Sequence, residues 1–160
     1  MTAMFSPFQT GVLKLRHRIV LAPMSRYRCT GQMAPHSLTA EYYAQRASPG
    51  GLLITEATHI NPEGTPVWNI YPEIRDHGGE SPGIWTDEQT AAYRHVVDKV
   101  HARGAYISCQ LQHCGRVAQE DIKDHPLVQG TDFPIGPVSS SAVPLRASAE
   151  EGNHYNWDQP

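Results

Sequence analysis

The chain has 160 residues, enough for one domain with a buried core, and 39% of its residues are hydrophobic while 18% are charged. A net charge of −3, with no run of lysines or arginines, argues against nucleic acid as a partner. Because no apolar run approaches the ~18 residues of a membrane span, the first residues lack a signal-peptide pattern and the three cysteines form no disulfide framework, we expect a cytoplasmic protein with no membrane partner.

The first elements are predicted from apolar runs and the residues that interrupt them. Residues 4–16 combine apolar side chains with a glycine turn and predict a short hairpin. A first strand is expected over 18–21, and Pro23 ends it because proline cannot donate a hydrogen bond to a sheet. A helix over 38–46 follows, with Ser37 as its N-cap.

The second half of the pattern repeats this alternation. A second strand is expected over 52–57, and a third over 105–111. Between them lies a Pro- and Gly-rich connection, 59–85, of a length that is usually functional or mobile. The second helix begins with a capping box formed by Thr86 and Gln89.

One face of this second helix is apolar, and its end is marked by a glycine. Ala92, Val96 and Val100 share the face that is expected to pack on the sheet, and Gly104 is predicted at the C′ position. Strands that alternate with helices indicate a parallel sheet, and both a doubly wound sheet and a closed barrel fit this order. The sequence lacks the glycine-rich dinucleotide and P-loop motifs, which disfavours those two versions.

Polar side chains follow the apolar part of each predicted strand. Ser25 and Arg26 follow the first strand, Thr55 and Glu56 close the second, and residues 110–116 close the third with amide, imidazole and guanidinium groups. The carboxyl ends of parallel strands meet at one edge, where α/β barrels bind their ligands. The sequence therefore predicts one shared site at these three strand ends.

Four segments, 13–26, 49–58, 82–89 and 110–116, resemble in order and spacing the Old Yellow Enzyme family of FMN-dependent ene-reductases, including its oxophytodienoate reductase branch. The resemblance implies an α/β fold, a (β/α)8 TIM barrel with FMN across its C-terminal mouth. Residues 1–160 would form the N-terminal portion of this domain, with about three parallel strands, intervening helices and long loops. Beyond about residue 117 an irregular chain is expected.

The resemblance also implies roles for individual residues, which are as follows. Pro23 and Met24 would pack near the isoalloxazine ring, Ser25 would approach its O4/N5 edge where the family usually has Thr or Cys, and Ala57 (backbone N–H) and Gln110 (amide) would bind the pyrimidine side. The substrate pocket is expected to include Tyr27, as a packing residue rather than an acid, and Gln112, where many members have Trp or Ala.

The implied activity is hydride transfer from NAD(P)H through FMN to an α,β-unsaturated carbonyl. The family's His-x-x-Asn or His-x-x-His pair, which holds the substrate carbonyl, does not occur in this sequence, and we assign no catalytic residue. The sequence also ends before a barrel of ~250 residues can close. The alternative is therefore a non-catalytic truncated product or fragment without independent flavin binding, which self-associates through unpaired strand edges.

Two further interpretations concern the end of the third strand. Cys109, His113 and Cys114 lack the Cys-x-x-Cys spacing of structural zinc sites, and no metal site is predicted. His113 and Arg116 fit either the flavin-site segment or an ordinary loop that binds backbone carbonyls and carboxylates. The residues alone leave these two interpretations open.

Overall fold

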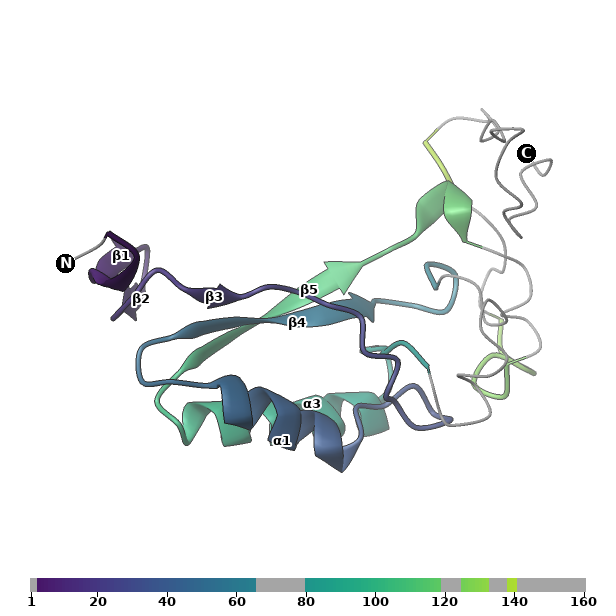
Figure 1. Cartoon of the computed structure of the whole chain (residues 1–160). Coiled ribbons are helices and arrows are strands. Elements are labelled where there is room, and N and C mark those ends of the chain that lie inside the picture. Colours follow the sequence, from purple (N-terminus) through teal and green to yellow (C-terminus); the bar gives the residue numbers. More distant parts are fainter. Residues whose placement is uncertain (1–2, 66–79, 119–124, 133–137, 141–160) are drawn as a thin grey trace, which may run out of the picture.

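The computed structural model describes residues 3–65, 80–118, 125–132 and 138–140. Within them, three parallel strands form a sheet, and two helices, α1 (Ser37–Arg46) and α3 (Asp87–His101), lie against one face of it (Figure 1). The predicted alternation of strand, helix, strand, helix and strand is confirmed. The fold is α/β, with both helices on the same side of the sheet.

The three strands are β3 (Val20–Leu21), β4 (Leu52–His59) and β5 (Tyr106–Gln112), and β4 lies in the centre of the sheet. Both strand pairs are parallel, which confirms the prediction. The boundaries differ from those predicted: β3 is shorter than 18–21, and β4 and β5 continue past their expected last residues. Polar residues continue both strands because the neighbouring strand, rather than hydrophobicity, satisfies their backbone groups.

An antiparallel hairpin precedes the sheet. A short 3₁₀ turn, η1 (Ala3–Phe5), leads into β1 (Phe8–Thr10), which pairs with β2 (Leu13–Leu15). Gly11 occupies the turn with φ of 54°, a conformation that glycine adopts without steric cost. The hairpin predicted over residues 4–16 is therefore confirmed.

Helix α1 begins one residue earlier than the sequence predicted. Its N-cap is His36, whose ring Nδ1 accepts a hydrogen bond from the Leu38 N–H at 3.2 Å. Ser37, the predicted N-cap, is instead the first helical residue. The imidazole nitrogen replaces the hydroxyl because the extended backbone of His36, with φ of −70° and ψ of 158°, places the turn into the helix at that residue.

Helix α3 begins with the capping box that the sequence predicted. The Thr86 hydroxyl accepts the Gln89 N–H at 3.2 Å, and the Gln89 side chain accepts the Thr86 N–H at 3.1 Å. Gly104 has φ of 73°, as expected for a glycine that ends a helix. The C-cap is Ala102, so the C′ residue is Arg103 and Gly104 lies one position later than predicted, at C″.

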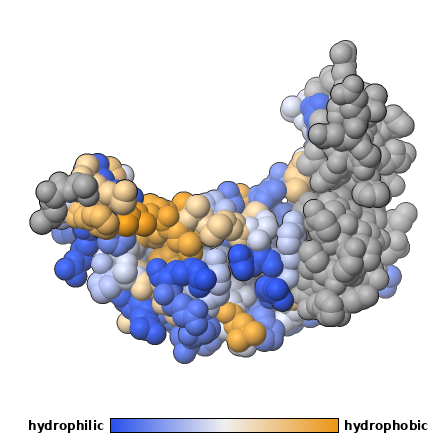
Figure 2. All heavy atoms as spheres, viewed as in Figure 1, coloured by the Kyte–Doolittle hydropathy of each residue, from blue (hydrophilic) through white to orange (hydrophobic). Residues whose placement is uncertain are grey.

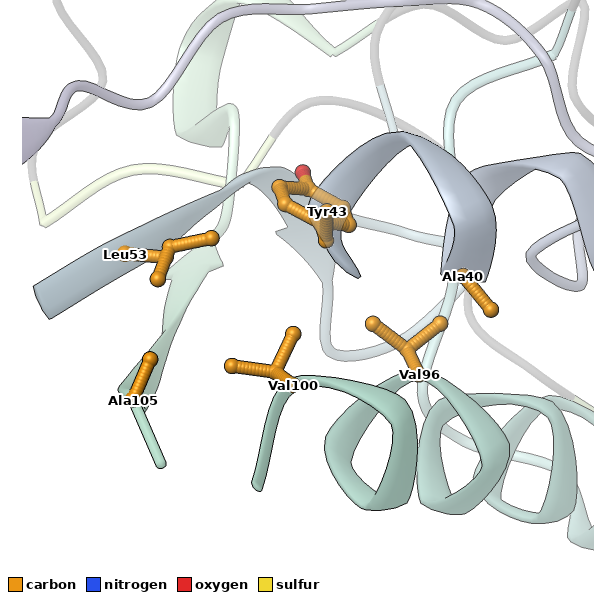
Figure 3. Close-up of a cluster of buried hydrophobic side chains, with 6 residues drawn as sticks. All are labelled: Ala40, Tyr43, Leu53, Val96, Val100 and Ala105. Atoms are coloured by element: carbon orange, nitrogen blue, oxygen red, sulfur yellow. The ribbon is translucent and has the colours of Figure 1, made fainter. Parts of the chain in front are cut away.

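The core lies between the two helices and the sheet (Figure 3). It comprises six buried side chains: Ala40, Tyr43, Leu53, Val96, Val100 and Ala105. Val96 and Val100 are buried as predicted from the apolar face of α3, whereas Ala92 is only half-buried. Full burial of a Leu or Val side chain contributes about 1.5–3 kcal/mol, so this cluster supplies much of the stability of the described part.

The opposite face and the two edge strands expose apolar groups. Leu111 of β5 is 61% exposed and Val20 of β3 is 38% exposed. Figure 2 shows hydrophobic residues gathered around the β1–β2 hairpin and β3, on the side of the sheet away from the helices. Among the described residues, β4 is the only strand that pairs with β5, so the other side of β5 is an unpaired edge.

The remaining described segments are irregular. A short 3₁₀ turn, η2 (Gly115–Val117), follows β5, and the described residues after it, 125–132 and 138–140, contain turns and bends but no helix or strand. The long connection predicted over 59–85 is described at 59–65 and 80–85, and its middle lies outside the described residues, as does most of the chain after 117. Among the helices of the described part, none is long and apolar enough to span a membrane.

Candidate functional site

The carboxyl ends of the three strands meet at one edge of the sheet. Ala57 of β4 and Gln110 of β5 are direct partners in the parallel register. The segment with Pro23, Met24 and Ser25 begins directly after β3, which pairs with β4 in the same direction. β3 ends opposite Leu53, and the segment after it continues along β4 as far as Glu56, in agreement with the predicted arrangement of the segments; that they form one ligand site stays a prediction.

A buried carboxylate fixes the segment after β3 to β4. Glu56 is 2% exposed, and its Oε2 accepts the backbone N–H of Arg26 at 2.7 Å. Arg26 directly follows Ser25, and Glu56 directly precedes Ala57, so this one bond brings two predicted site residues to the same place. Tyr27 has φ of 50°, an uncommon conformation for a residue with a side chain, which turns the chain around this carboxylate.

Burial raises the pKa of the Glu56 carboxyl above its usual value. The backbone N–H groups of Arg26 and Tyr27, and the positive charge of Arg26, act in the opposite direction but offset only part of the effect. On the other side, the Glu56 backbone N–H donates to the Tyr43 hydroxyl at 2.8 Å. Glu56 is thus held between the core and the loop after β3.

A β-bulge in β4 sets the position of Gln110. The pairing of β4 with β5 shifts register between Ile54 and Ala57. At this point the Thr55 hydroxyl accepts the Gln110 N–H at 3.0 Å and donates to the Glu56 carbonyl at 2.9 Å. The side chain of Thr55 therefore replaces a backbone partner, and Gln110 keeps an exposed side chain at the end of β5.

The predicted site residues differ in how open they are. Met24, Ser25 and Gln110 are exposed, while Pro23 and Ala57 are half-buried. For the Gln110 amide, the described part of the chain provides no hydrogen-bond partner, so its donor and acceptor are available to a ligand. All five lie toward the carboxyl end of the sheet, and their roles toward FMN remain predictions.

The two predicted substrate-pocket residues are both half-buried. Gln112 ends β5, and its amide donates to the Cys114 sulfur at 3.6 Å. Tyr27 follows the Glu56-bound turn described above. The structure therefore places both residues near the strand ends, and their contact with a substrate remains a prediction.

The loop after β5 makes local contacts. His113 Nδ1 accepts the Gly115 N–H at 2.9 Å, and the Arg116 guanidinium donates to the Ser139 hydroxyl. Neither partner is a backbone carbonyl or a carboxylate, the partners expected of an ordinary loop, so both interpretations of His113 and Arg116 stay predictions.

The sequence analysis did not predict a buried polar layer between β4 and α3. The Thr58 hydroxyl and the Tyr93 hydroxyl lie 2.5 Å apart, which links β4 to α3. His59 is 1% exposed, and neither ring nitrogen has a hydrogen-bond partner among the described residues. Burial lowers its pKa to about 4, with a further lowering from His113 and a partial offset from the Gly64 backbone. The only sequence signal for this layer was that polar residues continue the apolar run of β4.

A profile of the NADH:flavin oxidoreductase / NADH oxidase family matches residues 3–154. The chain belongs to this family. Within it, rice (Oryza sativa subsp. japonica) 12-oxophytodienoate reductase 7 is 42% identical, and the alignment covers 98% of this chain and 36% of that protein. The resemblance to the Old Yellow Enzyme family and its oxophytodienoate reductase branch is thereby confirmed.

Two solved structures of the same family have the corresponding fold. The Old Yellow Enzyme homologue from Zymomonas mobilis has a TM-score of 0.74 at 31% identity, covering 99% of this chain and 39% of its own. Morphinone reductase in complex with tetrahydroNAD has a TM-score of 0.69 at 39% identity, covering 93% of this chain and 35% of its own. The chain therefore has the fold of the N-terminal portion of a family (β/α)8 barrel and spans about a third of the length of these relatives.

Proposed function

We propose that this chain contributes the flavin-facing part of an FMN-dependent ene-reductase, with residues 1–160 as the N-terminal portion of one barrel domain. When bound, FMN would accept hydride from NAD(P)H and pass it to the β-carbon of an α,β-unsaturated carbonyl compound. The support for this proposal is family membership together with the geometry of the strand ends. No residue of this chain is assigned as the proton donor of that reaction.

The chemistry of the exposed groups fits the isoalloxazine ring. The Gln110 amide offers both a donor and an acceptor, which the alternating N–H and C=O groups of a flavin pyrimidine ring require. The side chains of Pro23 and Met24 would offer apolar surface to one face of the flat ring, and Met24 is 46% exposed. Ser25 adds a hydroxyl that would donate near the O4/N5 edge, and Ala57 a backbone N–H toward the pyrimidine side.

Two contacts support the proposed geometry more than any others. The Arg26–Glu56 hydrogen bond and the Ala57–Gln110 register fix the three strand ends relative to one another before any ligand arrives. Preorganised donors do not have to reorient when charge develops on a bound group, which is how such donors stabilise a reduced ring. Tyr27 and Gln112, from the first and third strand ends, would then line the space where the enone binds.

The exposed edge of the sheet favours the second candidate, a non-catalytic chain without independent flavin binding. Ser108, Cys109, Gln110 and Leu111 of β5 are all exposed, and Leu111 is 61% exposed. An unpaired, partly apolar edge strand invites pairing with another chain. On this alternative, the 160-residue chain would self-associate in a concentration-dependent way, which sedimentation velocity would detect, and added FMN would not change that behaviour.

The deciding experiment is a titration of the purified 160-residue chain with FMN, followed by the visible absorption and fluorescence of the flavin. Saturable quenching with shifted bands would support the proposal. Gln110→Ala removes hydrogen bonds of about 1–1.5 kcal/mol in total, so the dissociation constant is expected to rise about fivefold to tenfold.

Gln45→Ala is the matched control, because Gln45 is exposed on α1 and its amide donates to Glu41 on the same helix. This variant is expected to bind FMN like the parent chain. A flavin spectrum identical to that of free FMN would support the second candidate, a chain that does not bind flavin by itself. Equal weakening by both variants would remove Gln110 from the flavin site.

A further inference from the structure

The loop after β3 is also joined to helix α1, through the side chain of Arg26. The guanidinium carbon of Arg26 lies over the Tyr42 ring, 4.8 Å from its centre. The backbone N–H of the same residue donates to the Glu56 carboxylate at 2.7 Å. Arg26 therefore contacts both β4 and α1, and it directly follows Ser25, the exposed residue proposed to face the flavin O4/N5 edge.

The Tyr42 ring is held in place on its own helix. The Arg46 guanidinium carbon lies 3.7 Å from the centre of this ring, and Arg46 Nη1 donates to the Tyr42 backbone carbonyl at 2.9 Å. Tyr42 also packs against the core and meets Tyr43 edge to face, with 5.2 Å between the ring centres. The ring is therefore a fixed surface on which the Arg26 cation can rest.

The next tyrosine of α1 supports the other partner of the bond between Arg26 and Glu56. Tyr43 is 2% exposed, and its hydroxyl accepts the Glu56 N–H at 2.8 Å, so its side chain reaches from α1 to β4 (Figure 3). Tyr42 contacts Arg26, and Tyr43 contacts Glu56. Two consecutive residues of α1 thus support both sides of the bond that joins the loop to β4.

The turn that follows Arg26 requires such support. Tyr27 has φ of 50°, in the left-handed region that residues with a side chain rarely adopt. A backbone conformation of this kind persists only where surrounding contacts fix it. The contact between Arg26 and Tyr42 is one of these contacts, and an exposed cation–π pair shifts an equilibrium by about twofold to fivefold.

We propose that Tyr42 is a positioning residue, which holds the Arg26 guanidinium and thereby sets the position of the Ser25 hydroxyl. A hydrogen-bond donor that is already in place stabilises developing charge better than one that must reorient. Loss of the Tyr42 ring therefore changes the reduction potential of bound FMN through Ser25. This effect on the flavin rests on the function proposed above, whereas the hold on the loop does not.

The first test measures amide hydrogen exchange in the flavin-free 160-residue chain. The quantity compared is the protection factor of the Arg26 N–H, which falls when the loop separates from Glu56 more often. Tyr42→Leu keeps apolar bulk against the core but removes the ring, and we expect the protection factor to fall about twofold to fivefold. Tyr42→Phe keeps the ring and is expected to match the parent. Equal protection in Tyr42→Leu and the parent would overturn the proposal.

Two further variants separate this role from a general loss of stability. Tyr106→Leu changes another half-buried tyrosine, at the start of β5, and is expected to leave the protection of the Arg26 N–H unchanged. Arg26→Gln removes the cation, and Tyr42→Leu is expected to have no further effect in that background. The proposal is wrong if Tyr106→Leu lowers the protection as much as Tyr42→Leu, or if the effects of Arg26→Gln and Tyr42→Leu add in full.

The second test measures the reduction potential of FMN bound to the chain. Ser25→Ala is expected to shift this potential, and Tyr42→Leu to shift it in the same direction by a smaller amount, with Tyr42→Phe restoring the parent value. In the Ser25→Ala background, Tyr42→Leu is expected to cause no further shift. An equal shift in both backgrounds would overturn the action through Ser25. If the chain binds no FMN, the proposed function fails, and hydrogen exchange still decides whether Tyr42 holds the loop.

Discussion

The bond between Glu56 and the loop after β3 leads to a prediction about stability. Glu56→Ala removes the acceptor of the Arg26 N–H, a bond of 2.7 Å to a side chain that is 2% exposed. Because Arg26 itself is exposed, water can replace part of the lost partner, and we expect a cost of about 1 kcal/mol, that of a typical hydrogen bond. Glu56→Gln keeps a side-chain oxygen of the same reach, so we expect it to retain most of this bond.

The pH dependence of the same variant has a definite sign. Burial raises the pKa of Glu56 above its usual value of 4.5, so the folded chain holds the proton more tightly than the unfolded chain. Between these two values the folded state binds more protons, and the free energy of unfolding falls as the pH rises. Glu56→Gln lacks this titration. Its stability relative to the parent is therefore expected to increase as the pH rises through that window and to stay constant above it.

The assay is urea unfolding of the parent, Glu56→Ala and Glu56→Gln at a series of pH values from about 4 to 8. Glu41→Gln is the matched control, because Glu41 is exposed on α1. The quantity compared is the difference in the free energy of unfolding between each variant and the parent at the same pH, because other groups titrate in the same range. If Glu56→Gln loses as much stability as Glu56→Ala, or if its difference from the parent does not change with pH, the carboxylate is not the buried tether described above.

The remaining predictions concern the core, a helix cap and the buried histidine. Leu53→Ala, at a site that is 1% exposed, is expected to lower the free energy of unfolding by about 2–5 kcal/mol in urea, and a loss well below this would contradict a close-packed core. Thr86→Ala is expected to cost about 0.5–2 kcal/mol in the same assay, whereas Thr90→Ala, exposed on the same helix, is the control that leaves stability nearly unchanged. The pKa of His59 is lowered from 6.5 to about 4, so the unfolded chain takes up its proton first and the free energy of unfolding falls as the pH falls through this range. His59→Phe is expected to reduce that loss in acid unfolding. An unchanged acid unfolding profile would contradict the burial of a neutral ring.

Local signals in the sequence were sufficient for several elements. The capping box of Thr86 and Gln89 was predictable because both partners lie within one helical turn. The hairpin around Gly11 was predictable for the same reason, since its strands are adjacent in the chain. The N-cap of α1 was predicted at Ser37 and found at His36, because the backbone conformation that decides between neighbouring cap residues depends on how the preceding loop enters the helix.

For the candidate site, the sequence identified the strand ends but not what holds them together. The polar residues that follow each apolar run marked the strand ends with Ser25, Glu56 and Gln110, whereas Ala57 was assigned only from the family resemblance. The Glu56 tether joins positions 30 residues apart, and the Thr55 bond to Gln110 joins positions 55 residues apart. Neither pair has a periodicity or spacing that a single sequence reveals.

The sequence by itself determined the order of the elements, their parallel direction and the types of residue at their ends, because these depend on hydrophobic pattern and local hydrogen bonding. Only the tertiary structure decided which polar groups became buried, such as Glu56 and the ring of His59, and which remained open at the strand ends. The physical reason is that burial and hydrogen-bond satisfaction are set by neighbours distant in the chain, and those neighbours are known only when the sheet and helices have packed.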